Sequence, residues 1–273
     1  MKLKIYKAIA CLFIAVTAFA QQDLYHIKYG ADSQQQQLDL FLPKTITATT
    51  PVVIMLHGGA WSMGGNEYTD KHARDLRDRG FVVANVDYRY ADAKVHGKDL
   101  LNDIDNAVGW VENNAKKYGY KPKGYHMAGV SAGAHLSLLY GYTSKRGIKS
   151  INALCAPINF GTEEIMAALK KEGLLQTIEN LAGAKYTPGN LDPFKAVSPY
   201  WQITKVPTQL IHGDADPVVD YSQSVALHAK LQELKVPSNF ITQKGKGHDV
   251  GMNQPDSEKL NIDSIEAWVK KHD

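Results

Sequence analysis

The sequence has few cysteines, no apolar run long enough to cross a bilayer and no excess of charge of one sign. Only 2 of its 273 residues are cysteine, which excludes a framework of several disulfides. The 31 basic and 28 acidic side chains nearly balance, so neither a nucleic-acid footprint nor a polybasic membrane surface is predicted. The 10 histidines show no HExxH or comparable spacing, and we therefore predict no metal centre.

The first twenty residues are typical of a secretory signal peptide. Three lysines precede the apolar run 8–20, and residues 18–20 supply the small side chains of a cleavage site. The run of thirteen residues is short for a membrane helix. We predict a signal peptide over 1–20, a mature domain over 21–273, export to the periplasm or the extracellular space, and no stable membrane insertion after cleavage. Lipid attachment at Cys11 is an alternative, but it would divide the apolar run.

Removal of this segment changes the charge and the cysteine content of the chain. The loss of its three lysines leaves 28 basic side chains against 28 acidic ones, so the mature protein is near neutral. Cys155 becomes its one cysteine, and an internal disulfide is excluded. With 44% hydrophobic residues, a domain of this length is expected to be held together by core packing. The balance of charge favours a small or neutral partner over a polyanion.

Short apolar runs alternate with segments of helical spacing along most of the chain. Strands are predicted at 23–29, 37–42, 52–56, 81–86, 125–128, 151–155, 208–212 and 239–243. Helices are predicted at 70–79, 100–117, from Ser131 onward, near 221–234 and at 257–271. The first two strands are expected to form an antiparallel leading edge. The alternation of strand and helix predicts an α/β fold with a mostly parallel sheet and helices on both faces.

One long segment departs from this alternation. About fifty residues separate Cys155 from Thr208, and they contain a helical pattern over 163–181 but no strand. We predict a helical cap insertion at about 158–200, after the sixth strand, lying over the carboxyl ends of the strands. A solvated excursion is the alternative, but the apolar side chains of the helical pattern argue against it.

The pentapeptide GVSAG stands where a strand pattern changes to a helical one. Ser131 lies between Gly129 and Gly133, which is the context of a nucleophile elbow, a strained turn that exposes a serine hydroxyl. The simpler interpretation is a glycine turn with Ser131 as an ordinary helix cap. A serine hydroxyl is a weak nucleophile at neutral pH, so the elbow interpretation requires an imidazole to accept its proton and a carboxylate to orient the imidazole.

Two later loops supply both groups. HGDADP follows the strand at 208–212 and contains Asp216, while GKGH follows the strand at 239–243 and ends in His248. We predict Asp216 as the acid and His248 as the base. Asp214 and Asp220 remain alternatives for the acid, because spacing does not decide which carboxylate turns toward the imidazole.

The segment HGGAW after the strand at 52–56 is where a loop stabilising an oxyanion is expected. Its glycines allow backbone N–H groups to approach a negatively charged oxygen. We predict Gly59, Ala60 and Ala132 as the donors. Trp61 is predicted either to line the substrate pocket or to pack against the insertion, and His57 to brace the loop.

Six sequence blocks carry a resemblance to a known family. The blocks, in chain order, are HGGAW at 57–61, VDYR at 86–89, GVSAG at 129–133, Ser198-Pro199, HGDADPVV at 212–219 and GKGHD at 245–249. From about 37 to 271 the chain resembles the esterase and lipase superfamily of α/β-hydrolases, in the branch of hormone-sensitive-lipase-like and exported carbohydrate esterases. It departs from that branch at 90–94, which lack the usual leucine, proline and glutamate, and at Ala60, where many relatives have glycine.

The motifs and the resemblance together predict a secreted serine carboxylesterase. It would hydrolyse a small-molecule or oligosaccharide ester with a short acyl or aromatic group through an acyl-enzyme, without a cofactor. The resemblance implies acetyl or feruloyl groups of plant polysaccharide as targets. A peptidase, an amidase or a formamidase with the same three residues is one alternative, and a non-catalytic binding protein of the same fold is another. No nucleic-acid partner is expected.

Overall fold

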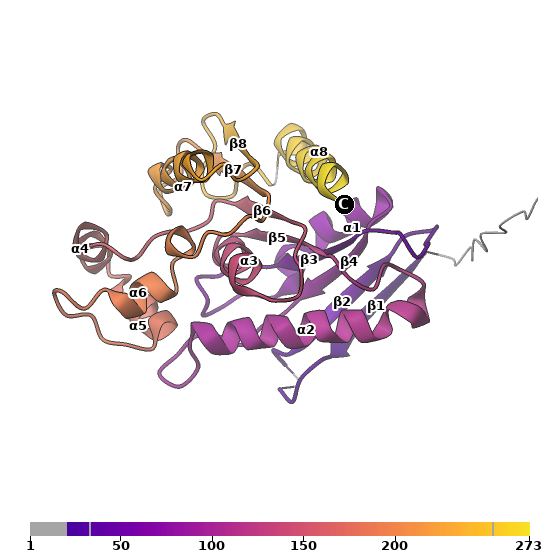
Figure 1. Cartoon of the computed structure of the whole chain (residues 1–273), viewed down its shortest axis with the longest axis horizontal. Helices are drawn as coiled ribbons and strands as arrows, with labels where there is room; N and C mark the ends of the chain where they lie inside the picture. Colours follow the sequence, from indigo (N-terminus) through magenta and orange to yellow (C-terminus); the bar gives the residue numbers. More distant parts are fainter. Residues whose placement is uncertain (1–20, 33, 253) are drawn as a thin grey trace, which may run out of the picture.

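The computed structural model describes residues 21–32, 34–252 and 254–273 (Figure 1). The predicted signal peptide and Cys11 lie outside these residues. Among the described residues, no helix combines the length and the apolar composition needed to span a bilayer.

An eight-stranded sheet forms the centre of the fold, with the strand order β1-β2-β4-β3-β5-β6-β7-β8. The strands are β1 (Gln22–Lys28), β2 (Gln37–Leu42), β3 (Val52–Leu56), β4 (Val82–Val86), β5 (His126–Val130), β6 (Ser150–Leu154), β7 (Thr208–Gly213) and β8 (Ser238–Gln243). β1 pairs antiparallel with β2, and β2 pairs antiparallel with β4. All later pairs are parallel. The predicted mostly parallel sheet with an antiparallel leading edge is confirmed.

Helices cover both faces of the sheet (Figure 1). They are α1 (Asp70–Asp78), α2 (Gly97–Tyr118), α3 (Ala132–Thr143), α7 (Ser222–Glu233) and α8 (Pro255–His272), with a short 3-10 helix η1 (Asn66–Tyr68) before α1. Side chains alternate between the faces along each strand. In β3, Ile54 therefore packs into the core beneath α2 and α3, while Met55 packs into the core beneath α1 and α8. The near-continuous apolar strands of the sequence follow from burial on both faces.

The predicted cap insertion after the sixth strand consists of several short helices. Between β6 and β7 lie α4 (Glu163–Lys171), α5 (Leu175–Ala182), α6 (Asp192–Ala196) and the 3-10 helix η2 (Pro199–Trp201). The single helical pattern predicted at 163–181 is wrong in one respect, because the helix is broken. Gly173 has φ +75°, a left-handed conformation that ends α4 and lets α5 begin in a new direction.

The strand before Ser131 is longer than the predicted 125–128. β5 continues through Gly129 and Val130, which pair with Ala153 and Leu154 of β6. Glycine is poor evidence for a strand when sequence alone is read, but here its missing side chain lets the following helix approach. The strand therefore extends to the residue immediately before Ser131.

Candidate active site

A sharp turn between β5 and α3 presents Ser131. Its backbone has φ 54° and ψ −120°, a strained conformation for a residue with a side chain. A Cβ on Gly129 would lie 2.5 Å from the carbonyl carbon of Gly133, and a Cβ on Gly133 would lie 2.2 Å from the Leu56 carbonyl oxygen. Glycine is therefore required on both sides of Ser131, because the start of α3 packs directly on the backbone of β3 and β5.

The structure brings the three predicted side chains into one hydrogen-bonded chain. His248 Nε2 lies 2.8 Å from Ser131 Oγ, and His248 Nδ1 lies 2.8 Å from Asp216 Oδ2. Asp216 comes from the loop after β7 and His248 from the loop after β8, so neighbouring strand ends carry both groups. The two alternative acids have other partners: Asp214 accepts from the Gly245 N–H and Asp220 from the Ser222 N–H. Geometry therefore selects Asp216.

Asp216 is held as a carboxylate. Burial alone raises the pKa of Asp216, but hydrogen bonds from His212 and His248 and from the N–H groups of Val218 and Val219 outweigh it. The net effect holds the pKa of Asp216 well below its usual range. The carboxylate therefore stays ionised near neutral pH, where its contact with His248 Nδ1 fixes the orientation of the imidazole ring.

His212 belongs to the site, although its position four residues before Asp216 was the only signal of it in the sequence. Its Nε2 lies 3.1 Å from Asp216 Oδ2 and 3.0 Å from the Val219 carbonyl oxygen. Because both neighbours are acceptors, Nε2 carries the hydrogen, and Nδ1 accepts from Ser224 Oγ at 2.7 Å. His212 is buried, and its Nε2 contacts the same oxygen of Asp216 as His248 Nδ1 does, so it fixes the carboxylate through a second hydrogen bond.

The loop after β3 approaches Ser131 closely. A Cβ on Gly58 would lie 3.3 Å from Ser131 Cβ. Gly59 and Ala60 have φ 118° and 49°, so the backbone here is left-handed and the loop turns sharply. Within the described chain, the N–H groups of Gly59, Ala60 and Ala132 donate to no protein acceptor. Their predicted role as oxyanion donors stays a prediction.

His57 braces this loop from beneath, as predicted. Its ring stacks on Tyr88 with centroids 4.3 Å apart, and the Tyr88 hydroxyl donates to the His57 carbonyl oxygen at 2.7 Å. His57 Nδ1 lies 2.6 Å from the Gly58 carbonyl oxygen. Burial lowers the pKa of His57, so the ring is neutral and structural.

Trp61 lines the cavity beside Ser131 and also packs against the insertion, while its role in a substrate pocket stays a prediction. It is buried, with 4% of its surface exposed, and its ring meets Phe160 edge-on at 5.9 Å. Its Nε1 donates to His135 Nδ1 at 3.1 Å, and His135 Nε2 in turn bonds the Val197 carbonyl oxygen at 2.7 Å. The tryptophan thereby ties the loop after β3 to α3 and to the insertion.

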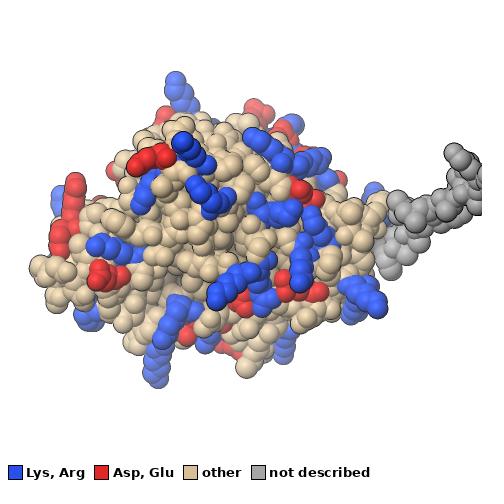
Figure 2. Space-filling model, in the orientation of Figure 1, with Lys and Arg blue, Asp and Glu red and all other residues tan. Residues whose placement is uncertain are grey.

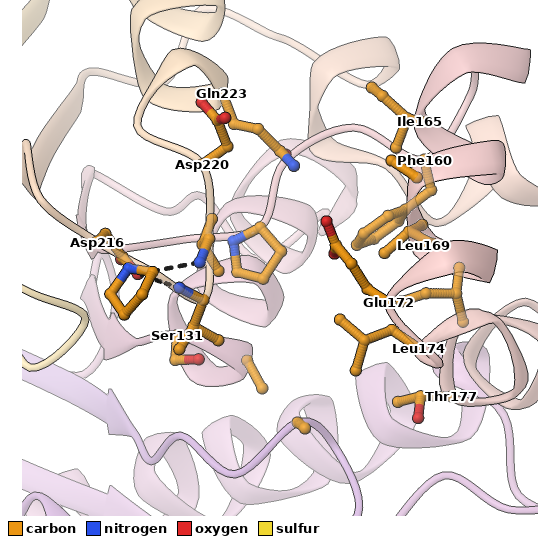
Figure 3. A pocket seen from close by; sticks show the side chains of 18 of the residues that line it. Ser131, Phe160, Ile165, Leu169, Glu172, Leu174, Thr177, Asp216, Asp220 and Gln223 are labelled. Atoms are coloured by element: carbon orange, nitrogen blue, oxygen red, sulfur yellow. Dashed lines mark hydrogen bonds between the residues drawn. The ribbon is translucent and has the colours of Figure 1, made fainter.

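A cavity of about 430 Å³ opens beside Ser131, between the strand ends and the insertion (Figure 3). Its wall on the insertion side is largely apolar and is formed by Phe160, Ile165, Leu169, Leu174 and Ile178. Glu164, Glu172, Asp220 and Gln223 add polar groups. The volume is typical of a site for a small ligand or for one end of a larger one.

Cys155 lies directly beneath the histidine. Its Sγ donates to the His248 carbonyl oxygen at 2.8 Å. In the described part of the chain, Cys155, Asp216 and His248 form the one group of potential metal ligands whose ligand atoms approach one another, within 4.8 Å. This donor set fits a metal poorly, because Asp216 and His248 already bind each other and burial raises the pKa of the Cys155 thiol well above its usual range.

The sheet, the strained turn and the Ser131–His248–Asp216 chain of hydrogen bonds define a domain of the α/β-hydrolase class. The chain belongs to the BD-FAE family, whose model matches residues 38–231. This match confirms the predicted resemblance to α/β-hydrolase esterases.

Curated relatives and a solved structure agree with this assignment. The chain is 27% identical over 257 residues to "Probable isoprenylcysteine alpha-carbonyl methylesterase ICME" of Oryza sativa subsp. japonica, covering 87% of this chain and 61% of the relative. It is 25% identical to "Esterase LipC" of Mycobacterium tuberculosis (strain ATCC 25618 / H37Rv), covering 81% and 58%. The chain thus spans about 60% of the length of these two relatives.

The structure is similar to that of a "Truncated form of carbohydrate esterase from gut microbiota". The TM-score is 0.79 and the sequence identity is 22%, over 93% of this chain and 98% of that chain. At this identity the likeness shows the fold.

Proposed function

We propose that the protein is an exported serine carboxylesterase acting on short-acyl or aromatic esters. The observation that carries the proposal is the Ser131–His248–Asp216 chain of hydrogen bonds beside a partly apolar cavity. The names of the relatives as esterases support the same reaction class. In this proposal the segment 1–20 is removed on export, so the intact mass of the secreted protein corresponds to a chain that begins at Gln21.

The proposed mechanism follows from the positions of the hydrogen-bonding atoms. His248 Nε2 accepts the Ser131 proton while Oγ attacks the ester carbonyl, and Asp216 stabilises the imidazolium that forms. Backbone N–H groups of Gly59, Ala60 and Ala132 receive the negative charge that develops on the carbonyl oxygen. His248 then protonates the leaving alcohol, and a water molecule deprotonated by His248 releases the acid from Ser131.

The proposed natural targets are acetyl or feruloyl esters of plant polysaccharide. The cavity of about 430 Å³ beside Ser131 has room for a small acyl group or one aromatic ring, and its apolar wall suits the packing of such groups. The carbohydrate esterase with the similar fold supports this choice among ester substrates.

The test is a substrate series with a matched pair of serine variants. Aryl esters of increasing acyl length, acetylated and feruloylated xylo-oligosaccharides, and the corresponding amides are assayed with the wild type, Ser131→Ala and Ser137→Ala. Ser137 lies on the same helix, and its buried hydroxyl has no partner among the described residues. The expected result is hydrolysis by the wild type and by Ser137→Ala, with a loss of at least about 10³-fold in Ser131→Ala.

Each other result selects a different conclusion. Release from the oligosaccharides identifies the natural ester, whereas release from aryl esters alone leaves the carboxylesterase without its carbohydrate target. Faster cleavage of amides than of esters indicates the amidase. A folded wild type that hydrolyses nothing and fails to react with an alkyl phosphonate refutes the enzyme and favours the binding protein.

A further inference from the structure

The cavity beside Ser131 carries negative charge without compensation. Its lining includes the carboxylates of Glu164, Glu172 and Asp220 besides the histidine-bound Asp216, and it includes no lysine or arginine. Within the part of the chain that the structure describes, none of these three carboxylates forms an ion pair with a basic side chain. The wall of the site is therefore acidic as well as apolar.

The three carboxylates come from separate places around the cavity. Glu164 lies in the first turn of α4, Glu172 at its carboxyl end and Asp220 just before α7. Figure 3 shows Glu172 projecting into the space between the apolar wall and Ser131, with Asp220 on the other side. Carboxylates therefore border the cavity on more than one side.

Other carboxylates of the insertion have partners. Glu179 pairs with Lys185 at 2.6 Å, and Glu163 accepts hydrogen bonds from the Tyr186 hydroxyl and from the Gly189 N–H. On the face of the molecule in Figure 2, basic side chains lie among acidic ones, as expected from the balanced composition. Glu164, Glu172 and Asp220 thus differ from Glu179, which has a basic partner.

We propose that Glu164, Glu172 and Asp220 set the charge preference of the site: neutral and cationic esters are accepted and anionic esters are rejected. This inference rests on the proposed esterase function and adds the electrostatic class of its substrate. The same charges repel the carboxylate product, which forms when the released acid loses its proton to water, and so they favour its departure from the cavity.

The size of the effect follows from Coulomb interactions in a solvated cleft. A substrate charge about 8 Å from each of three carboxylates, in a water-like dielectric, changes kcat/KM by roughly tenfold in total at low salt. At about 1 M salt the screening length is near 3 Å, and most of this effect is lost.

Pairs of esters with similar shape but different charge separate the effect of substrate charge from the effect of substrate shape. Acetylcholine and 3,3-dimethylbutyl acetate differ by a trimethylammonium group in place of a tert-butyl group, and monoethyl succinate is the anionic counterpart of diethyl succinate. For the wild type at low salt we expect the cationic ester to exceed its neutral isostere in kcat/KM by about tenfold, and the neutral succinate ester to exceed the anionic one similarly. Both ratios fall toward one at about 1 M salt.

The variants attribute these ratios to particular residues. In the triple variant Glu164→Gln, Glu172→Gln, Asp220→Asn, both ratios fall to within about twofold of one. Glu233→Gln is the matched control, because Glu233 is an exposed carboxylate at the far end of α7, about 16 Å along the helix from Ser222. In Glu233→Gln both kcat/KM ratios are expected to stay at the wild-type values. Because each ratio compares two esters with the same variant, a general loss of activity cancels.

A binding measurement separates this inference from the esterase proposal. Ser131→Ala, which is expected not to turn over, is titrated calorimetrically with acetylcholine and with 3,3-dimethylbutyl acetate. Tighter binding of acetylcholine than of 3,3-dimethylbutyl acetate supports the charge preference if the difference is lost when the triple substitution is added to Ser131→Ala. This conclusion holds even if the wild type hydrolyses no ester. Equal affinities, or ratios that the triple substitution leaves unchanged, overturn it.

Discussion

Replacement of Gly133 by alanine tests whether the approach of α3 to β3 requires glycine. The added Cβ would lie 2.2 Å from the Leu56 carbonyl oxygen and 2.3 Å from the His57 carbonyl oxygen, whereas ordinary contacts begin at 3.4 Å. Either α3 or the end of β3 must therefore move by about 1.2 Å, the difference between 3.4 and 2.2 Å. Both obstructing atoms belong to the backbone, so no rotamer change relieves the contact.

The expected cost follows from two opposing contributions. Overpacking costs about 1–3 kcal/mol, and alanine returns up to about 1 kcal/mol of helix propensity relative to glycine. A net loss of roughly 1–2 kcal/mol lowers the melting temperature of a domain of this size by about 2–8 °C. The effect on kcat is larger, because a shift of about 1 Å at the residues preceding Gly59 and Ala60 costs on the order of a hundredfold.

The assay compares Gly133→Ala with Gly109→Ala by thermal unfolding and by ester hydrolysis at 25 °C, where both variants are folded. A Cβ on Gly109, within α2, would meet the end of the flexible Arg146 side chain at 3.2 Å. Gly109→Ala is therefore expected to change stability by less than about 1 kcal/mol and to keep full activity. The reasoning is refuted if Gly133→Ala melts within about 1 °C of the wild type and keeps kcat within about threefold.

Three further predictions concern neighbouring groups. Asp216→Asn is expected to lower kcat/KM for an aryl ester by about 10³–10⁴-fold. Asp214 is the matched carboxylate of the same loop, and Asp214→Asn is expected to change kcat/KM by less than about threefold. Equal losses in the two variants would contradict the choice of Asp216 as the acid. Trp61→Phe leaves His135 Nδ1 without its donor and is expected to lower the free energy of unfolding in urea by about 1–3 kcal/mol. In a His135→Leu background the same substitution is expected to cost less. An equal loss of stability in both backgrounds would contradict a stabilising hydrogen bond between Trp61 and His135. Burial raises the pKa of Asp87 to about 6 from 3.8, so the folded state holds this proton more tightly than the unfolded chain does, and the stabilisation that protonation provides at acid pH is lost as the pH rises through 6. Asp87→Asn is therefore expected to stabilise the protein by about 1 kcal/mol more at pH 8 than at pH 5, and a pH-independent effect in urea titrations would contradict the assignment.

Much of the fold was predictable because buried parallel strands and amphipathic helices leave strong local patterns. β3, for example, has the predicted limits 52–56. Errors occurred where a contact distant in sequence determines the local structure. β5 extends through Gly129 because the absence of a side chain there serves the packing of α3, and the insertion breaks at Gly173 because its two helices follow different directions.

The three side chains proposed to react could be predicted because each follows a recognisable strand, and spacing then limits the possible acids to a few. The choice among Asp214, Asp216 and Asp220 required the direction of each side chain. His212 was missed because it acts through Asp216. The charge of the cavity was also beyond prediction, because the residues that produce it are separated in sequence and become neighbours only when the insertion folds over the strand ends.

Several residues with positive φ lie at the carboxyl ends of the central parallel strands. Ala60 and Trp61 after β3, Ser131 after β5 and Cys155 after β6 all have positive φ, and these three strands are adjacent in the sheet. Such conformations cost of order 1–3 kcal/mol each for residues with side chains. Selection for higher stability and selection for faster turnover therefore oppose each other at these positive-φ residues. A substitution that relieves the backbone strain, such as Ser131→Gly, would yield a more stable but inactive protein. Heat-adapted descendants that remain active would have to gain their stability at other positions.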